Sequence, residues 1–96
     1  SDVNTITKTK LTPLHFACFV NSLEIIKLLL NYNINVNHKD NTGKTALMIA
    51  CENNNFMIVQ EILKHNPNIN ITDNENNKAI DFTDDKQIIN LLNQYK

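Results

Sequence analysis

The chain repeats itself every 33 residues, and this period constrains its fold more than any other feature of the sequence. Residues 12–18 read TPLHFAC, residues 45–51 read TALMIAC, and an eroded third copy at 78–84 reads KAIDFTD. A period of this length indicates an array of small units that stack in a row, because one unit alone cannot bury its apolar face. The period therefore predicts an elongated repeat domain.

Each copy begins with the signals of a short helix. Thr12 can cap a helix, and Pro13 then occupies the first helical position, where its missing N–H has no cost. The apolar residues that follow fall at i, i+3 and i+4, on one helical face: Leu14, Ala17 and Cys18. We expect this helix to end near Asn21.

A second helix is predicted directly after the first. Asn21, with Glu24 three residues later, reads as its capping box. Residues 25–30 are apolar on most of the helical circumference, which predicts a helix covered by neighbours on both sides. Asn33 follows at a position suited to a left-handed helix terminus, where Asn is the best residue after Gly.

The second copy repeats this order after a turn. Residues 40–43 read DNTG, with Asp first and Gly last, which is typical of a β-turn. Thr45 then caps a helix, and residues 53–55, three asparagines, form the turn between the helices. The second helix of this copy should end at or before Asn66, because a residue before proline resists helical geometry. Its core face is predicted to contain Phe56, Ile58, Val59, Ile62 and Leu63.

The third copy is contracted. Ile88-Ile89 stands three residues earlier than the spacing of Ile58-Val59 predicts. The segment Thr83-Asp84-Asp85 should cap the last helix, with Gln87 three residues after Asp84 completing a capping box. That helix is apolar on one face and polar on the other, which is typical of a terminal capping repeat.

The motif Thr-Pro-Leu-His-x-Ala at a 33-residue period resembles the ankyrin repeat. The resemblance covers essentially the whole chain and implies an all-α solenoid of helix-turn-helix units linked by β-hairpin fingers. It divides the chain into the tail of a preceding repeat (1–9), two repeats (10–42 and 43–75) and a C-terminal capping repeat (76–96). Val3-Asn4 precedes Val36-Asn37 by one period. We therefore expect the C-terminal end of a longer array, the alternative being a native N-terminal lead-in.

Composition excludes several classes of function. The net charge of −1 provides no basic field for nucleic acid or an anionic membrane. Asparagine makes up about a fifth of the chain. Because the apolar positions are periodic, as in a folded domain, we place the asparagines in turns, in helix caps and on the surface. Cys18 and Cys51, one period apart, are too distant for a disulfide in stacked repeats. They indicate a reducing, cytoplasmic location, and no apolar run reaches membrane-spanning length.

Candidate chemistry is sparse. His15 and Cys18 lie at i and i+3, but a metal site needs three or four ligands. The resemblance gives His15 a hydrogen-bonding role within the scaffold, and His38 and His65 are expected to be exposed in loops. No nucleophile arrangement occurs, and one glycine cannot form a phosphate cradle. We therefore predict no catalytic, cofactor-binding or metal-binding residues, no cofactor and no enzyme activity.

The resemblance also implies where a partner binds: the concave side, through finger tips and the outward face of each first helix. Carried over by position, these residues are Lys8, Thr9, Leu11, Phe19, Val20, Lys39, Asn41, Thr42, Lys44, Glu52, Asn53, Thr72, Asn74, Glu75 and Asn77. Phe19 and Val20 are unusually apolar for these positions. They are either a hydrophobic anchor for a partner or a surface covered by an upstream repeat.

The function predicted from the sequence is a non-catalytic protein–protein interaction module, monomeric, that binds a protein or peptide partner. One alternative is a targeting or regulatory array attached to an enzyme or ligand-binding domain, such as an acyl-carrier- or lipid-binding module. Another is a purely structural spacer. A shared scaffold does not identify the partner, because function is carried by sites grafted onto a fold.

Overall fold

The structure, a computed structural model, describes residues 11–32 and 34–95, and within these ranges it contains helices and turns but no strand. The described helical segments, in chain order, are α1 (Pro13–Phe19), α2 (Leu23–Leu30), α3 (Ala46–Glu52), α4 (Phe56–Leu63), the 3-10 helix η1 (Ala79–Phe82) and α5 (Lys86–Gln94).

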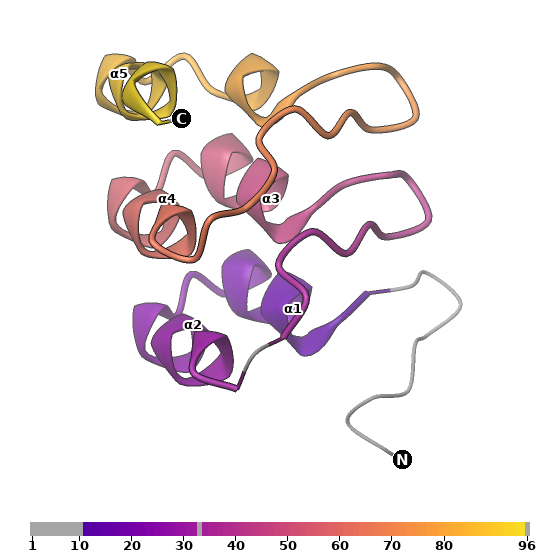
Figure 1. The fold of residues 1–96 in the computed structure, drawn as a ribbon, viewed down its shortest axis with the longest axis vertical. Helices are drawn as coiled ribbons and strands as arrows, with labels where there is room; N and C mark the ends of the chain where they lie inside the picture. Colours follow the sequence, from indigo (N-terminus) through magenta and orange to yellow (C-terminus); the bar gives the residue numbers. More distant parts are fainter. Residues whose placement is uncertain (1–10, 33, 96) are drawn as a thin grey trace.

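The helices form three stacked pairs. α1 lies against α2, α3 against α4, and η1 against α5. Between pairs, α3 lies between α1 and η1, and α4 lies between α2 and α5. Figure 1 shows the two resulting columns of helices, with the loops before α3 and η1 projecting to one side. The predicted all-α stack is confirmed, and the projecting fingers are turns rather than paired strands over the described residues.

The local geometry repeats with the 33-residue period. Thr12 and Thr45 cap α1 and α3, and each accepts a hydrogen bond from the amide three residues later. The Ser22 amide donates to the Ala17 carbonyl (3.1 Å), and the Asn55 amide donates to the Ala50 carbonyl (3.2 Å). Equivalent residues therefore make equivalent bonds in the first two pairs.

The predicted capping boxes of α2 and α5 are wrong by one residue. Asn21 and Asn54 adopt φ values of 57° and 55° and form the left-handed turn between helices. The cap therefore moves to the next residue, and Ser22 accepts from the Ile25 amide at 3.3 Å. At α5 the cap is Asp85, not Asp84, because its carboxylate accepts from the Gln87 and Ile88 amides.

The third pair is contracted, as the spacing predicts. Its first helix is the four-residue η1, and the buried Thr83 ends it. The Thr83 hydroxyl donates to Asn54 Oδ1 at 2.6 Å, which ties the shortened connection to the turn of the second pair. The Tyr95 hydroxyl donates to the Pro67 carbonyl at 2.7 Å and holds the end of α5 in the same way.

The core runs through the middle of the stack and is densest at α3, where every residue from Ala46 to Cys51 is buried. In α4 the predicted core residues are buried except Phe56, which is half-buried, and the helix ends at Leu63 as expected. In α2 the outcome differs from the prediction. Ile25 and Leu28 are exposed because α2 lies against α4 on one side only among the described residues. The expectation for Asn33 lies outside the described residues.

Candidate binding surface

Each finger is held by an aspartate at its base. Asp40 Oδ1 accepts from the Thr42 amide (2.9 Å), the Thr42 hydroxyl (2.7 Å) and the Lys44 amide (2.9 Å). Asp73 Oδ1 accepts from the Glu75 and Asn77 amides at 2.9 and 2.8 Å. A carboxylate that accepts several amide hydrogen bonds organises its loop around a single charge. The backbone of each of these finger tips is therefore held in a defined conformation, from which its side chains project.

The same contacts keep both carboxylates ionised. Burial acts to raise the pKa of Asp40, but hydrogen bonds from Thr42 and Lys44 outweigh it, so that the net pKa is lowered. The pKa of Asp73 is lowered chiefly by the backbone hydrogen bond from Asn77. Hydrogen bonding to the charged form favours that form.

The fingers are also joined to each other. The Asn74 amide donates to the Thr42 carbonyl, and its side-chain Nδ2 donates to the Asn41 carbonyl, both at 3.0 Å. Gly43 makes this approach possible, since a Cβ on it would lie 2.7 Å from the Asn74 nitrogen. Asn37 Oδ1 adds a further tie between loops by accepting from the Asn68 amide at 2.8 Å.

His15 links the first pair to the finger that precedes α3. Its Nδ1 lies 2.8 Å from the Thr12 hydroxyl and 3.3 Å from the Thr12 amide, and its Nε2 lies 2.9 Å from the Lys44 carbonyl. A carbonyl only accepts, so Nε2 carries the proton and Nδ1 is the acceptor. Burial is the main cause that lowers the pKa of His15, in keeping with this neutral form. The scaffold role expected for His15 is confirmed.

His38 is not the exposed residue that we expected. It is half-buried because its ring meets that of His15 edge-on, with centroids 6.1 Å apart and planes at 81°. His65 is exposed, as predicted.

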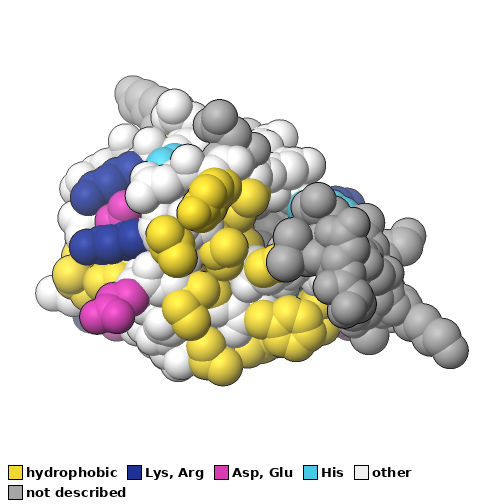
Figure 2. All heavy atoms as spheres, turned by 90° about the horizontal axis from the view of Figure 1, so that it is seen from below, with side chains coloured by type: hydrophobic (Ala, Val, Ile, Leu, Met, Phe, Trp, Pro, Cys, Tyr) yellow, Lys and Arg dark blue, Asp and Glu magenta, His cyan; other side chains and the backbone are white. Residues whose placement is uncertain are grey.

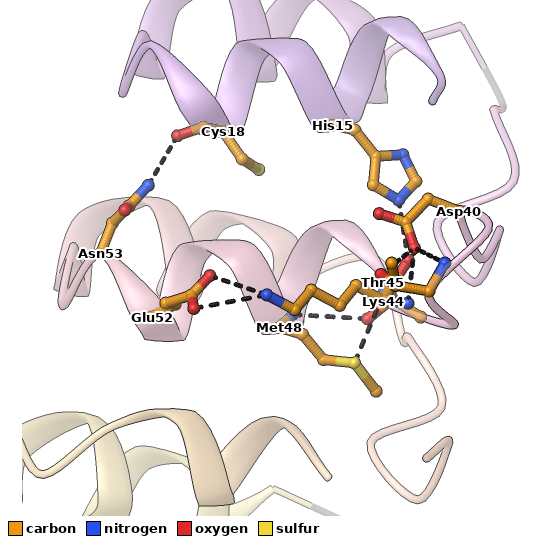
Figure 3. Close-up of polar contacts among 9 residues, drawn as sticks. His15, Cys18, Asp40, Lys44, Thr45, Met48, Glu52 and Asn53 are labelled. Atoms are coloured by element: carbon orange, nitrogen blue, oxygen red, sulfur yellow. Dashed lines mark hydrogen bonds and ion pairs between the residues drawn. The ribbon is translucent and has the colours of Figure 1, made fainter. Parts of the chain in front are cut away.

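Two of the predicted binding residues form an ion pair at α3. Lys44 Nζ lies 3.2 and 3.3 Å from the two carboxylate oxygens of Glu52, as Figure 3 shows. The same ammonium lies 5.2 Å from the centre of the Phe82 ring in the next unit, within range of a cation–π contact. The charges of Lys44 and Glu52 are therefore balanced within the molecule.

Asn53 is likewise engaged in the stack. Its Nδ2 donates to the Cys18 carbonyl at 2.9 Å, a contact visible in Figure 3, and it also lies 3.4 Å from Asn21 Oδ1. The Cys18 carbonyl, near the end of α1, also accepts from the Asn21 amide at 3.2 Å, so the bond from Asn53 adds a tie between the units at an acceptor that is already engaged.

Phe19 and Val20, in contrast, present free apolar surface at the end of α1. Phe19 is 49% exposed and Val20 is 66% exposed. The Phe19 ring meets the Phe16 ring edge-on, with centroids 6.2 Å apart, so the two rings form one aromatic surface. Phe16, also 49% exposed, was not predicted. Phe16 does not lie on the apolar helical face formed by Leu14, Ala17 and Cys18. This position in the helix could have predicted from the sequence that Phe16 is exposed.

The remaining predicted binding residues that the structure describes lie on the fingers before α3 and η1, apart from Leu11, which precedes α1. Lys8 and Thr9 lie outside the described residues. The exposed ones are Lys39, Asn41, Thr42, Asn74 and Glu75. The half-buried ones are Leu11, Thr72 and Asn77.

The described residues contain no set of three His, Cys, Asp or Glu side chains placed to hold a metal ion. Burial raises the pKa of the free thiols Cys18 and Cys51 to about 12, which makes them inert packing groups. None of the helices in 11–32 and 34–95 is long and apolar enough to span a bilayer.

Stacked helix pairs with ordered fingers on one side define a solenoid repeat protein. A family model described as ankyrin repeats, three copies, matches residues 1–73. The chain belongs to the ankyrin repeat family, whose members generally act as protein-interaction modules. No curated protein matches the chain.

Proposed function

We propose that this protein is a non-catalytic interaction module that binds a protein or peptide partner on its concave surface. That surface comprises the finger tips and the C-terminal ends of the first helices. The observation that carries the proposal is the exposure of the apolar residues Phe19 and Val20 at the C-terminal end of α1. Aromatic residues at the centre of a polar rim contribute a large share of binding energy in protein interfaces.

Equivalent positions in the first and second units indicate which surfaces are buried by stacking and which stay exposed for a partner. One period after Phe19 and Val20 stand Glu52 and Asn53, which are exposed although a pair of helices lies on either side of α3. The same shift takes Phe16 to Ile49, which is 1% exposed. A neighbouring unit therefore covers the position of Phe16 but not the positions of Phe19 and Val20. Their apolar character favours a partner over a missing repeat.

The surroundings of this anchor indicate the chemistry of the partner. Lys44 and Glu52 neutralise each other, and the exposed finger residues are mostly Asn and Thr with hydrogen-bonding groups, together with Lys39 and Glu75 of opposite charge. We expect a partner segment with an apolar side chain at its centre and uncharged polar groups around it. Because few free charges are involved, binding should depend weakly on salt.

The test is a comparison of Phe19→Ala with Met57→Ala. Met57 is 56% exposed on α4, away from the concave side, and so provides a matched loss of exposed apolar surface. Proteins captured by the native chain from extracts of its source are identified, and the affinity of the purified partner is measured by calorimetry. We expect Phe19→Ala to weaken binding about tenfold or more and Met57→Ala to leave it unchanged. Equal affinity for both variants would contradict the proposal.

We also propose that the protein is a monomer in a reducing, cytoplasmic compartment. The free buried thiols of Cys18 and Cys51 support the compartment. Sedimentation and thiol titration of the protein isolated from its source test the two statements, with one mass and two reactive thiols after unfolding as the expected result.

A further inference from the structure

The two ends of the described stack differ in the character of their surfaces. Figure 2 views the molecule from the α1–α2 end, where hydrophobic side chains gather. At the opposite end α5 is largely polar, and its exposed residues include Lys86, Gln87, Asn90 and Asn93. An apolar hollow beside this polar surface is therefore a candidate binding site.

Such a hollow, which we call the α5 cavity, lies where the loop after α4, the start of η1 and the end of α5 meet. Its volume is about 180 Å³. It is lined by three apolar residues, Ile69, Ile80 and Leu92, and by three polar residues, Asn70, Lys78 and Asn93. The three polar residues are exposed, so the cavity is open to solvent. An apolar cavity of about 150 Å³ can hold a benzene-sized group. The α5 cavity is therefore large enough for one apolar side chain.

Lys78 departs from the pattern of its repeat position. The equivalent residues in the first two units are Thr12 and Thr45, and each caps its helix with its hydroxyl. Lys78 makes no side-chain cap to η1, and its ammonium forms no ion pair with any described residue. Positions where a sequence breaks a local structural rule are often functional. Lys78 is therefore a candidate for contact with a ligand.

The two asparagines of the α5 cavity also have unused hydrogen-bonding groups. Asn37, one period before Asn70, accepts a bond from the Asn68 amide with its side chain at 2.8 Å. The side-chain amides of Asn70 and Asn93, in contrast, make no hydrogen bond to the described part of the chain. Two amide donors and one ammonium thus surround an apolar floor.

We propose that the α5 cavity binds the C-terminal residue of a partner polypeptide. Among its six lining residues only Lys78 is charged, so the complementary group is an anion. A carboxylate suits it, because an ammonium and amide groups together make charge-assisted hydrogen bonds to carboxylate oxygens. A C-terminal residue bears its carboxylate and its side chain on the same carbon atom. One apolar residue such as leucine can therefore reach both the floor and the rim of a cavity this small.

This site is separate from the concave surface proposed above, since neither Phe19 nor Val20 lines it. The test uses the full chain, isotope-labelled, and the peptide acetyl-Gly-Ser-Gly-Leu with a free carboxylate. Amide chemical shifts are followed during the titration. We expect saturable shifts centred on the lining residues, with a Kd of about 1 mM or below. Replacing the terminal carboxylate by an amide should weaken binding about tenfold or more.

Lys78→Thr isolates the contribution of the ammonium, because it copies the capping residue of the other two units. The variant should keep or raise the Tm of the chain, yet bind the free-carboxylate peptide about tenfold more weakly. Lys86→Gln is the matched control. It removes an exposed charge from the other end of α5, outside the cavity, and should leave the affinity unchanged.

Three results would overturn the proposal: no saturable shift with the peptide, equal affinity for its carboxylate and amide forms, or native affinity in Lys78→Thr. Octanoate is titrated in parallel. If it shifts the same amides while the peptide does not, the cavity takes a fatty-acid-like carboxylate instead of a polypeptide terminus. None of these results bears on the concave surface, and Phe19→Ala should bind the peptide as the native chain does.

Discussion

At the scale of single residues, the N3 position of each first helix determines how that helix is capped and what it contacts. His15, Met48 and Asp81 occupy this position in the three units, and each accepts a hydrogen bond from its N-cap amide. His15 also donates to the Lys44 carbonyl of the next unit. An imidazole combines an acceptor with a donor on the opposite side of the ring, which a thioether and a carboxylate do not.

Replacing His15 should therefore cost more than a helix cap alone. His15→Leu leaves the Thr12 amide without this acceptor and removes one of the two donors to the Lys44 carbonyl, which keeps the bond from the Asp40 amide. We expect a loss of about 2 kcal/mol in the free energy of unfolding. His15→Met, which copies the second unit, keeps an acceptor for the Thr12 amide and should cost about 1 kcal/mol less. Urea unfolding measures both. Equal losses would show that the cap bond contributes nothing.

The lowered pKa of His15 predicts a dependence of stability on pH. Burial holds the native pKa below the ordinary value of 6.5. As pH falls through 6.5, the unfolded chain binds a proton that the native state does not, so the free energy of unfolding should fall between about pH 7.5 and 5.5. The lowered pKa values of Asp40 and Asp73 act only below about pH 5.

The control for this dependence is His15→Met, which removes the titrating group. Urea unfolding at intervals across that range should show a flatter profile for the variant than for the native chain. Parallel profiles would mean that His15 does not supply the dependence.

At the scale of elements, the two fingers use different residues for one backbone geometry. Gly43 and Asn76, one period apart, adopt φ values of 85° and 64°. Asn tolerates the left-handed region better than other residues with a Cβ. Gly43 has a second constraint, because Asn74 of the next finger approaches it too closely for any side chain.

This difference predicts unequal effects of the same substitution. Asn76→Ala removes the short polar side chain that helps a residue with a Cβ to tolerate the left-handed region, and it should cost about 1 kcal/mol, whereas Asn76→Gly should be neutral or slightly stabilising. Gly43→Ala adds a collision with the Asn74 backbone and should cost about 2 kcal/mol or more. Thermal unfolding of the three variants compares them. A Gly43→Ala variant as stable as Asn76→Ala would contradict the close approach of the fingers.

The helix pairs were predictable from the sequence because their signals are local. The Thr12 and Thr45 caps, the apolar spacing and Pro67 each act within a few residues. The cap at Ser22 was not predictable, since Asn21 and Ser22 are both good capping residues and the left-handed turn decides between them. The tie from Asn53 to the Cys18 carbonyl spans 35 residues and has no local signal. Local signals therefore could not predict which of the proposed binding residues are already engaged within the stack.

At the scale of the whole molecule, stability is shared between neighbouring pairs. The α3–α4 pair has a helix pair on both sides, whereas within the described chain α1–α2 and η1–α5 each have one on a single side. In such an array, stability is approximately a sum of unit and nearest-neighbour interface terms. Local opening should therefore be easiest at the ends, and easiest of all at α1–α2, where the apolar residues Phe16, Ile25 and Leu28 are exposed.

Hydrogen exchange tests this order, and a pair of residues one period apart tests its cause. We expect the slowest amides in α3 and α4 and faster exchange in α1 and α2. Ile58→Ala, at a fully buried site on α4, should cost about 2–4 kcal/mol and raise exchange in α1–α2 more than in α5. Ile25→Ala, at the equivalent but 47% exposed site, should cost under about 1 kcal/mol. Uniform exchange in all helices, or equal costs at the two isoleucines, would mean that the pairs unfold as one body without a weaker end.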